Sequence, residues 1–436
     1  MPRRETRTGG RGATDAIIPG RFALSIGFPS RLPQQGYEWR KLADLARMES
    51  GHTPSRSRPE YWNGGIPWVG IKDATGNHGS VIYETLQEVS QDGIDNSSAR
   101  VLPTNTVCLS RTASVGYVVV MGRPMATSQD FVNWVCGPEI APEYLKYILM
   151  VEQESIRKFS YGTTHQTLYY PDAKALHVCI PSRRDQDAVA QVLGSLEDKM
   201  SHNGGLLRKL DALERACFTG LMAESGGVVP LADLLMLTKG VSYRSADLVD
   251  SDTGMVTLKS ITRDGYYSER GLKPFAGDYR SDQSLVNGDV VIAQTDLTQN
   301  ADVVGRAVRV RSSAEYSKLV ASLDLVVARP IQGVPVEYIL GVLRQERFRR
   351  YCQDHSSGTT VLHLRVGALG RYEAPTIDPI KQREYAAKVR SLHALGDAIQ
   401  RESQRLRDLR DLLLVNLISG RMRVRQAEQQ VEAVLQ

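Results

Sequence analysis

The stretch QDAVAQVLGSLEDKMSHNGGLLRKLDALERACFTG at residues 186–220 decides the fold, because its pattern begins again 196 residues later, at 382–420. In both copies apolar residues recur at alternating gaps of four and three, which is typical of a helix packed along another helix. Both copies end at a glycine, a natural helix stop. The seam positions are Val189, Leu193, Leu196, Met200, Asn203, Leu207 and Leu210, then Tyr385, Val389, Leu392, Gly396, Ile399, Ser403 and Leu406.

The matched register predicts two spacer helices, at 184–224 and 381–425, that pack against each other. The alternative is that each helix packs only on its own domain. A helix over 186–220 would be about 50 Å long at 1.5 Å per residue. Polar Asn203 and Ser403 in the seam would weaken the pair but fix its register.

The repeat extends beyond the helices. Leu-Ala-Asp-Leu at 42–45 returns at 231–234, and Gly-Thr-Thr at 162–164 returns at 358–360. The two blocks, 37–183 and 225–380, mix short β-rich runs with turns and one or two helical stretches, without regular alternation. We therefore predict an α+β fold with two similar domains, separated by the long helices and related by a pseudo-twofold axis.

Composition and charge bound the class of protein. The chain has 436 residues and a net charge of +5, but residues 1–36 hold six arginines against two acids, and 421–436 three against two. The body, 37–420, is therefore neutral, and binding to an anionic polymer would need local clusters of charge. We expect residues 1–36 to be a disordered Arg-rich tail and 426–436 a C-terminal tail. Five cysteines without CxxC spacing, and the lack of a long apolar run, predict a soluble cytoplasmic protein without metal sites.

Motifs of catalysis are missing from the sequence. It contains no phosphate-binding GxxxxGK[ST] loop, no HExxH, no GxSxG elbow and no adenine-methyltransferase tetrapeptide. This combination favours a binding protein. Two alternatives stay open, namely a DNA-modifying enzyme with a divergent active site and a duplicated scaffold without a role on DNA.

Two similar but divergent domains on a rigid spacer suit a ligand with two different landmarks at a fixed distance. Double-stranded DNA is such a ligand, because half-sites on one face recur about every 34 Å. Non-identical domains would read an asymmetric, split target.

Several motifs resemble target-recognition domains of the specificity subunits of Type I restriction–modification systems. They are Glu-Ser-Gly-His-Thr-Pro-Ser at 49–55, Pro-Glu-Tyr-Trp at 59–62, Ile-Pro-Trp-Val at 66–69, Ile-Lys-Asp-Ala at 71–74, Leu-Ser-Arg-Thr at 109–112, Gly-Thr-Thr at 162–164 and Phe-Thr-Gly at 218–220. The resemblance covers about 37–425. The second copy departs from it, with Gly-Val-Ser-Tyr at 240–243 and with Gln294 where the first has Arg111.

The resemblance implies a DNA sequence-specificity subunit with no catalytic activity, whose helices form an antiparallel coiled coil that sets the gap between half-sites. It further implies two DNA adenine methyltransferase (modification) subunits as partners, which use S-adenosylmethionine, and restriction subunits that use ATP and Mg²⁺ where they are present. No cofactor is expected on this chain itself, and no membrane is expected as a partner.

Candidate DNA contacts are donors and acceptors near strand ends and loops. Each has a simpler interpretation: a turn for the Gly-Thr-Thr loops, a surface ion pair for Arg111, and solvated side chains for the lysines. Trp62 and Trp68 are expected in the core. The candidates are Lys72, Arg111, Gly162, Thr163, Thr164, His165, Gln166, Lys259, Gln294, Gly358, Thr359 and Thr360.

Overall fold

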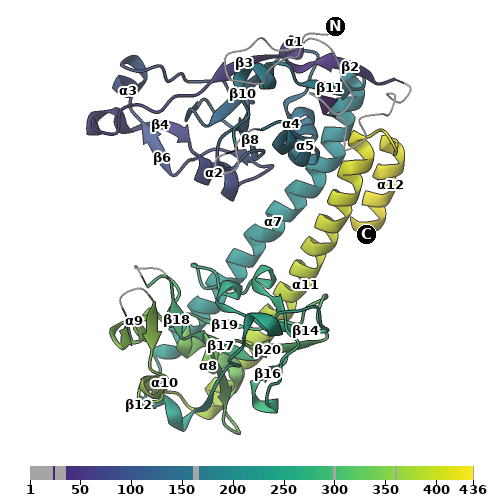
Figure 1. Ribbon diagram of the computed structural model, residues 1–436. Coiled ribbons are helices and arrows are strands. Elements are labelled where there is room, and N and C mark those ends of the chain that lie inside the picture. The colour runs from purple at the N-terminus through teal and green to yellow at the C-terminus, as the bar shows by residue number, and fades with distance from the viewer. Residues whose placement is uncertain (1–22, 25–35, 161–165, 298–300, 359–360, 436) are drawn as a thin grey trace. The chain divides into compact units, whose positions relative to one another are not determined.

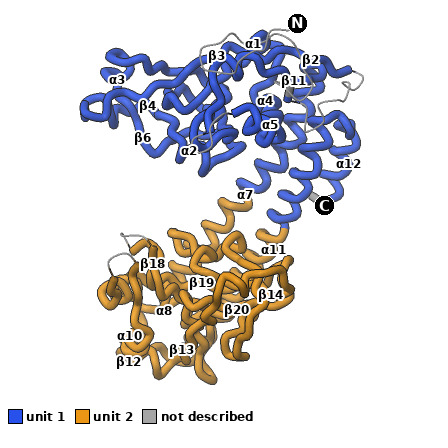
Figure 2. Tube along the Cα trace, in the orientation of Figure 1, with its two compact units in different colours: residues 1–202, 402–436 blue, residues 203–401 orange. Residues whose placement is uncertain are grey.

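The computed structural model describes residues 23–24, 36–160, 166–297, 301–358 and 361–435. The chain divides into two compact units, residues 1–202 with 402–436 and residues 203–401 (Figure 2). Each unit holds one repeat domain and one part of each long helix.

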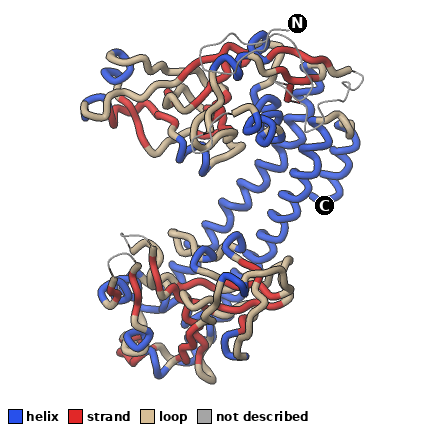
Figure 3. Tube along the Cα trace, in the orientation of Figure 1, coloured by secondary structure: helices blue, strands red, loops and turns tan. Residues whose placement is uncertain are grey.

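The first unit, whose strands are coloured red in Figure 3, is built around a five-stranded sheet. Its strand order is β3-β10-β7-β8-β5, and β3, β10 and β8 are labelled in Figure 1. Its strands are β3 (Ala46–Ser50), β10 (Phe131–Cys136), β7 (Val107–Ser110), β8 (Val118–Met121) and β5 (Val81–Ile82). Apolar side chains of β7 alternate between two cores: Val107 and Leu109 pack in the core that contains helix α4 (Pro142–Val151), whereas Cys108 packs on the other face. Because both faces are covered, β7 and β8 are continuous apolar runs.

Two smaller sheets and short helices complete this domain. The sheets have the orders β6-β4-β9 and β1-β11-β2. Their strands are β4 (Trp62–Val69), β6 (Gln87–Val89), β9 (Ala126–Thr127), β1 (Ala23–Leu24), β11 (His177–Ile180) and β2 (Glu38–Lys41). The helices are α1 (Leu42–Leu45), α2 (Ile71–Gly76), α3 (Gln91–Asp95), α5 (Gln153–Lys158), α6 (Tyr170–Lys174) and the 3-10 turn η1 (Pro59–Tyr61).

The second unit repeats this plan. Its main sheet has the order β13-β21-β17-β19, and others have the orders β15-β14-β20-β16, β12-β24 and β18-β23-β22. The strands are β12 (Gly227–Pro230), β13 (Leu235–Lys239), β14 (Thr253–Val256), β15 (Lys273–Pro274), β16 (Ser284–Leu285), β17 (Val290–Ala293), β18 (Thr295–Asp296), β19 (Ala307–Arg309), β20 (Lys318–Ala321), β21 (Leu325–Pro330), β22 (Ser356–Ser357), β23 (Leu362–Leu364) and β24 (Glu373–Thr376). The helices are α8 (Val336–Leu343), α9 (Glu346–Asp354), α10 (Val366–Leu369) and five 3-10 turns, Leu231–Asp233, Ser245–Asp247, Leu258–Ser260, Glu269–Gly271 and Ser281–Gln283.

The internal repeat is visible in individual hydrogen bonds. In each unit the amide that enters the domain donates to a carbonyl just before the last strand, and the glutamine that opens the long helix donates back to the chain before it. The matching pairs are Leu42 N–Leu176 O and Leu231 N–Tyr372 O, both 2.8 Å, then Gln186 Nε2–Pro181 O (3.0 Å) and Gln382 Nε2–Ile377 O (2.8 Å).

The two long helices are α7 (Arg183–Met222) and α11 (Pro379–Ile418). In the second unit a methyl group added at Gly396 of α11 would contact Leu207 and Leu210 of α7 at 3.7–3.8 Å. In the first unit Lys199 of α7 forms an ion pair with Glu402 of α11 (3.4 Å). Higher residue numbers on α7 lie beside lower residue numbers on α11, so the two helices run antiparallel. Together with the two mixed domains, this gives an α+β fold with an antiparallel coiled coil. Side chains of the predicted seam are buried or half-buried.

Two expectations for the chain ends need correction. The segment 426–436, expected as a tail, lies mostly in helix α12 (Val424–Leu435), because Ala427 and Val431 fall on one face of a turn and are buried in the first unit's core. Within the expected disordered tail 1–36, Ala23–Leu24 form strand β1, which pairs in parallel with β11 and buries Leu24. Residues 1–22 and 25–35 lie outside the described residues.

Candidate nucleic-acid interface

Several candidates meet at one edge of the first unit's main sheet, where β3 and β7 end and β10 begins. The Arg111 amide donates to the carbonyl of Asp130 (2.7 Å), and the amide of Ala113 donates to the carbonyl of Gln166 (3.0 Å). The Thr53 hydroxyl donates to the exposed Gln129 side chain on the same edge. Four chain segments far apart in sequence thus present polar groups side by side.

Gly51 and Gly240 shape this edge in the two units. A methyl group at Gly51 would lie 2.0 Å from the carbonyl oxygen of Ser128, and one at Gly240 would lie 2.0 Å from that of Ser322. Only glycine permits such a close approach of two backbones. The same clash in both units shows why this glycine persists where the sequence beside it has diverged.

Arg111 is half-buried and bound to the edge itself. Its Nε donates to the carbonyl of Gln129 (3.0 Å), its Nη1 donates to that of Leu168 (3.2 Å), and its guanidinium lies 4.3 Å from the Tyr170 ring centroid. The simpler interpretation as a surface ion pair is therefore wrong, since carbonyl oxygens and a ring are its partners. Arg111 ties three segments of the edge together.

The second unit has an equivalent edge with different side chains. The Gln294 amide donates to the carbonyl of Asp324 (2.8 Å), as that of Arg111 does to Asp130. Gln294 is half-buried, and its side-chain oxygen is buried without a hydrogen-bond partner among the described residues, so its contact with DNA stays a prediction. Exposed Leu323 takes the position of Gln129. Gly358 lies in the left-handed region (φ +135°).

Part of the predicted site lies outside the described residues. This holds for Gly162, Thr163, Thr164, His165, Thr359 and Thr360. Gln166 is exposed and borders them.

Lys72 and Lys259 occupy equivalent, exposed positions. Each follows a buried strand whose last carbonyl accepts a hydrogen bond from a serine amide, at 3.0 Å in the first unit and 2.9 Å in the second. Both lysines are exposed, and their contact with phosphate stays a prediction.

Sequence reasoning missed Arg56. Its guanidinium lies 3.7 Å from the ring centroid of Trp62 and 5.1 Å from that of Trp68, and Nη2 donates to Gln87 Oε1 (2.9 Å). Trp68 is buried, as expected, whereas Trp62 is half-buried. The stacking orders the exposed loop Ser55–Arg58. The sequence signal that could have revealed this contact is the run Ser-Arg-Ser-Arg at 55–58, which precedes both tryptophans.

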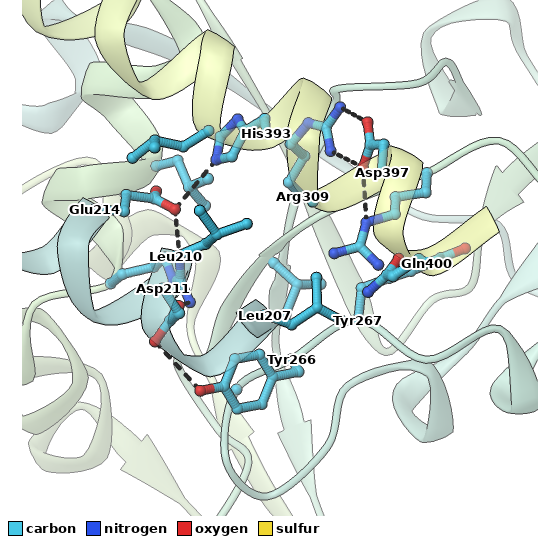
Figure 4. A pocket seen from close by; sticks show the side chains of 17 residues that line it. Leu207, Leu210, Asp211, Glu214, Tyr266, Tyr267, Arg309, His393, Asp397 and Gln400 are labelled. Atoms are coloured by element: carbon cyan, nitrogen blue, oxygen red, sulfur yellow. Dashed lines mark hydrogen bonds and ion pairs between the residues drawn. The ribbon is translucent and has the colours of Figure 1, made fainter. Parts of the chain in front are cut away.

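Charged residues also bind the second domain to its part of the helices (Figure 4). Arg344, at the end of α8, contacts Asp211 and also Glu214 (3.2 Å) on α7, and His393 of α11 contacts Glu214 (3.2 Å). Arg309 of β19 pairs with Asp397 of α11 at 2.7 Å. Burial acts to raise the pKa of Asp211 and Glu214, but their basic partners outweigh it and lower both.

The first domain is bound to α7 in a similar way. Lys146 of α4, nearly fully buried, forms an ion pair with Glu197 (2.8 Å), and the Tyr147 hydroxyl donates to the same carboxylate (3.0 Å). Each repeat domain is thus fixed to its helix segment by a charge that would be costly to leave unpaired.

Candidate metal ligands and cysteines are scattered over the described part of the chain. Among the described residues no group of three or more His, Cys, Asp or Glu could hold a metal ion. The five cysteines are free, and burial raises the pKa of Cys108 and Cys352, which disfavours reactive thiolates. No helix in the described ranges is long and apolar enough to cross a membrane.

The duplicated α+β domains, each joined to one part of the paired helices, define a two-domain architecture, and comparisons with known proteins show what it resembles. Residues 34–212 match the family model of the Type I restriction modification DNA specificity domain. The chain is 29% identical over 164 residues to the Type I restriction enzyme MjaIX specificity subunit of Methanocaldococcus jannaschii (37% of this chain, 38% of that protein). It is 28% identical over 155 residues to the HindI specificity subunit of Haemophilus influenzae (34% and 33%).

A solved structure shares the fold. The S subunit of a Type-I restriction-modification system from M. genitalium matches with a TM-score of 0.54 and 15% identity, over 87% of this chain and 96% of that one. The resemblance to Type I specificity subunits is therefore confirmed. The sequence alignments span only about a third to two fifths of these curated relatives.

Proposed function

We propose that this chain is the DNA sequence-specificity subunit of a Type I restriction–modification complex. Each domain reads one half of a bipartite, asymmetric target, and the helix pair sets the distance between the halves. The chain recruits two modification subunits that methylate adenine with S-adenosylmethionine, and restriction subunits where these are present. It carries no active site of its own and works in the cytoplasm.

One observation carries this proposal: two sheet edges share a backbone framework but present different side chains. At equivalent exposed positions the first edge presents Gln129 and the second presents Leu323. Amide side chains suit adenine edges, whereas apolar ones suit the thymine methyl group. A shared framework with different reading groups supports two unlike half-sites.

The runner-up is a DNA-modifying enzyme with a divergent active site. Purified chain is incubated with DNA and labelled S-adenosylmethionine, with and without modification subunits. The proposal predicts methyl transfer only in the mixture. Methyl transfer by the purified chain alone would overturn it.

Salt-dependent DNA binding by the assembled complex distinguishes a specificity subunit or a DNA-modifying enzyme from a protein scaffold without a role on DNA. Phosphate contacts release counterions, so affinity should fall as salt rises. Affinity indistinguishable from zero at low salt would favour the scaffold.

A further inference from the structure

A cavity of about 70 Å³ in the second unit is lined by nine residues, four of which are arginines. Its volume exceeds what a single water needs. Arg306 follows the turn before β19, Arg349 comes from α9, Arg344 ends α8, and Arg215 lies on α7. Glu346 is the acidic residue among the residues that line this cavity.

Charge is not balanced around this cavity. Arg215 and Arg344 are both paired with Asp211. The acidic partner of Arg349 is Glu346 at 3.8 Å, whose side chain is 56% exposed, and its Nη2 donates to the carbonyls of Ala301 (3.2 Å) and Asp302 (3.5 Å). Within the described residues Arg306 has no carboxylate within 4.0 Å, and its Nε donates to a backbone carbonyl (3.1 Å). The surplus of positive charge therefore lies at Arg306 and Arg349.

Both surplus arginines are unfavourable as they stand. The Nε of Arg349 is buried and has no hydrogen-bond partner among the described residues. Burial, and then the neighbouring Arg349, lower the pKa of Arg306. A buried donor without a partner destabilises the protein, so the arrangement favours an acceptor in the cavity.

The first unit carries other residues at the two positions equivalent to Arg306 and Arg349, although Arg157 of α5 lies nearby, with its Nε donating to the Val115 carbonyl (3.1 Å). The amides of Gly116 and Gly305 donate to equivalent carbonyls, both at 3.0 Å, and the next residues are Tyr117 and Arg306. A methyl group on either glycine would approach the carbonyl oxygen of one α5 or α9 residue, Gln153 or Arg349. Gln153 instead satisfies its own amide, by donating to the Gly116 carbonyl (3.1 Å). The two arginines are thus a feature of the second domain alone.

We propose that this cavity binds a phosphate group, with Arg306 and Arg349 as the donors. Guanidinium groups suit phosphate oxygens in charge and geometry. Either a backbone phosphate of DNA or the phosphate of a small molecule has this chemistry. Assigning it to DNA rests on the proposed function, and would make this pocket a positioning contact rather than a base reader.

The test uses Arg306→Tyr and Arg349→Gln, which introduce the residues that the first repeat already carries. Arg350→Gln is the control, because its side chain is 74% exposed on the same helix. Inorganic phosphate is titrated into the full chain at constant ionic strength, and the thermal midpoint is followed. Stabilisation of wild type and control, weakened at least tenfold in apparent affinity in both variants, supports the site.

A second arm measures DNA affinity of the assembled complex against salt concentration. Loss of one phosphate contact should lower the slope of log K against log salt by about 0.9 in the variants but not in the control. A lower slope assigns the phosphate to DNA. An unchanged slope, with phosphate binding lost in the variants, assigns it to a small molecule.

Variants that match wild type in both arms, with equal stabilisation by phosphate and an unchanged slope, would overturn the site. If the wild-type complex fails to bind DNA, the proposed function fails, while the phosphate titration still decides on the cavity.

Discussion

Replacing Arg344 by methionine tests how firmly the second domain is fixed to the helices. The Arg344 side chain is 13% exposed and contacts Asp211 and Glu214, which are 13% and 8% exposed. Breaking a buried charge cluster by removing one partner typically costs about 3–5 kcal/mol. In the variant, Asp211 still forms its ion pair with Arg215 (2.8 Å), and Glu214 still contacts His393. We therefore expect the free energy of unfolding to fall by the lower end of this range, about 3 kcal/mol.

Amide hydrogen exchange of the full chain is the assay, because the two units need not unfold together. A loss of about 3 kcal/mol lowers protection about a hundredfold, since each 1.4 kcal/mol is tenfold. The loss should concentrate in α8 and residues 203–222 of α7. Protection of the first unit should stay as in wild type.

Two further variants make the test sharp. Arg350→Met breaks an exposed pair (3.6 Å to Glu346), so it should cost about 0–1 kcal/mol. The triple variant Arg344→Met, Asp211→Asn, Glu214→Gln removes the stranded charges and should recover most of the loss. Equal small losses in Arg344→Met and Arg350→Met would refute the buried-charge reasoning.

Three other changes have definite expected outcomes. Gly51→Ala drives a methyl group to 2.0 Å from the Ser128 carbonyl and should cost about 3 kcal/mol or more in denaturant unfolding of the first unit, whereas Gly76→Ala, with open space around it, should be well tolerated. Burial raises the pKa of Glu152 from 4.5 to about 7, so stability should fall as pH rises across that range, by about 3 kcal/mol; thermal midpoints that fall equally in Glu152→Gln would contradict this. Inserting one heptad into both long helices should abolish methylation at the original half-site spacing, and unchanged spacing would dismiss the helices as a ruler.

The long-range plan of this fold could be predicted from sequence, because periodicity and repetition survive divergence. The heptad seam and the 196-residue offset from Gln186 to Gln382 predict both helices and their mutual packing. Helix α12 was missed because Ala427 and Val431 are a weak apolar stripe in a polar segment. Strand β1 was missed because its pairing with β11, more than 150 residues away, leaves no local pattern.

The site was less predictable than the fold, because side-chain partners depend on tertiary contacts. Sequence order placed Arg111 at a strand end but could not show that two carbonyl groups and the Tyr170 ring bind it. The stacking of Arg56 on tryptophans and the cavity at Arg306 both join segments that are distant in the sequence. Aligning the two repeats residue by residue would have revealed that arginine replaces tyrosine at Arg306.

Mapping methylated adenines genome-wide, in a host with its modification subunits and with or without this chain, tests the central claim most directly. The account predicts methylation at one split, asymmetric motif that is present only with the chain. Substituting Gln129 should change the methylated sequence in one half of the motif only. Methylation that is independent of the chain, or that falls on a single uninterrupted palindrome, would contradict the account.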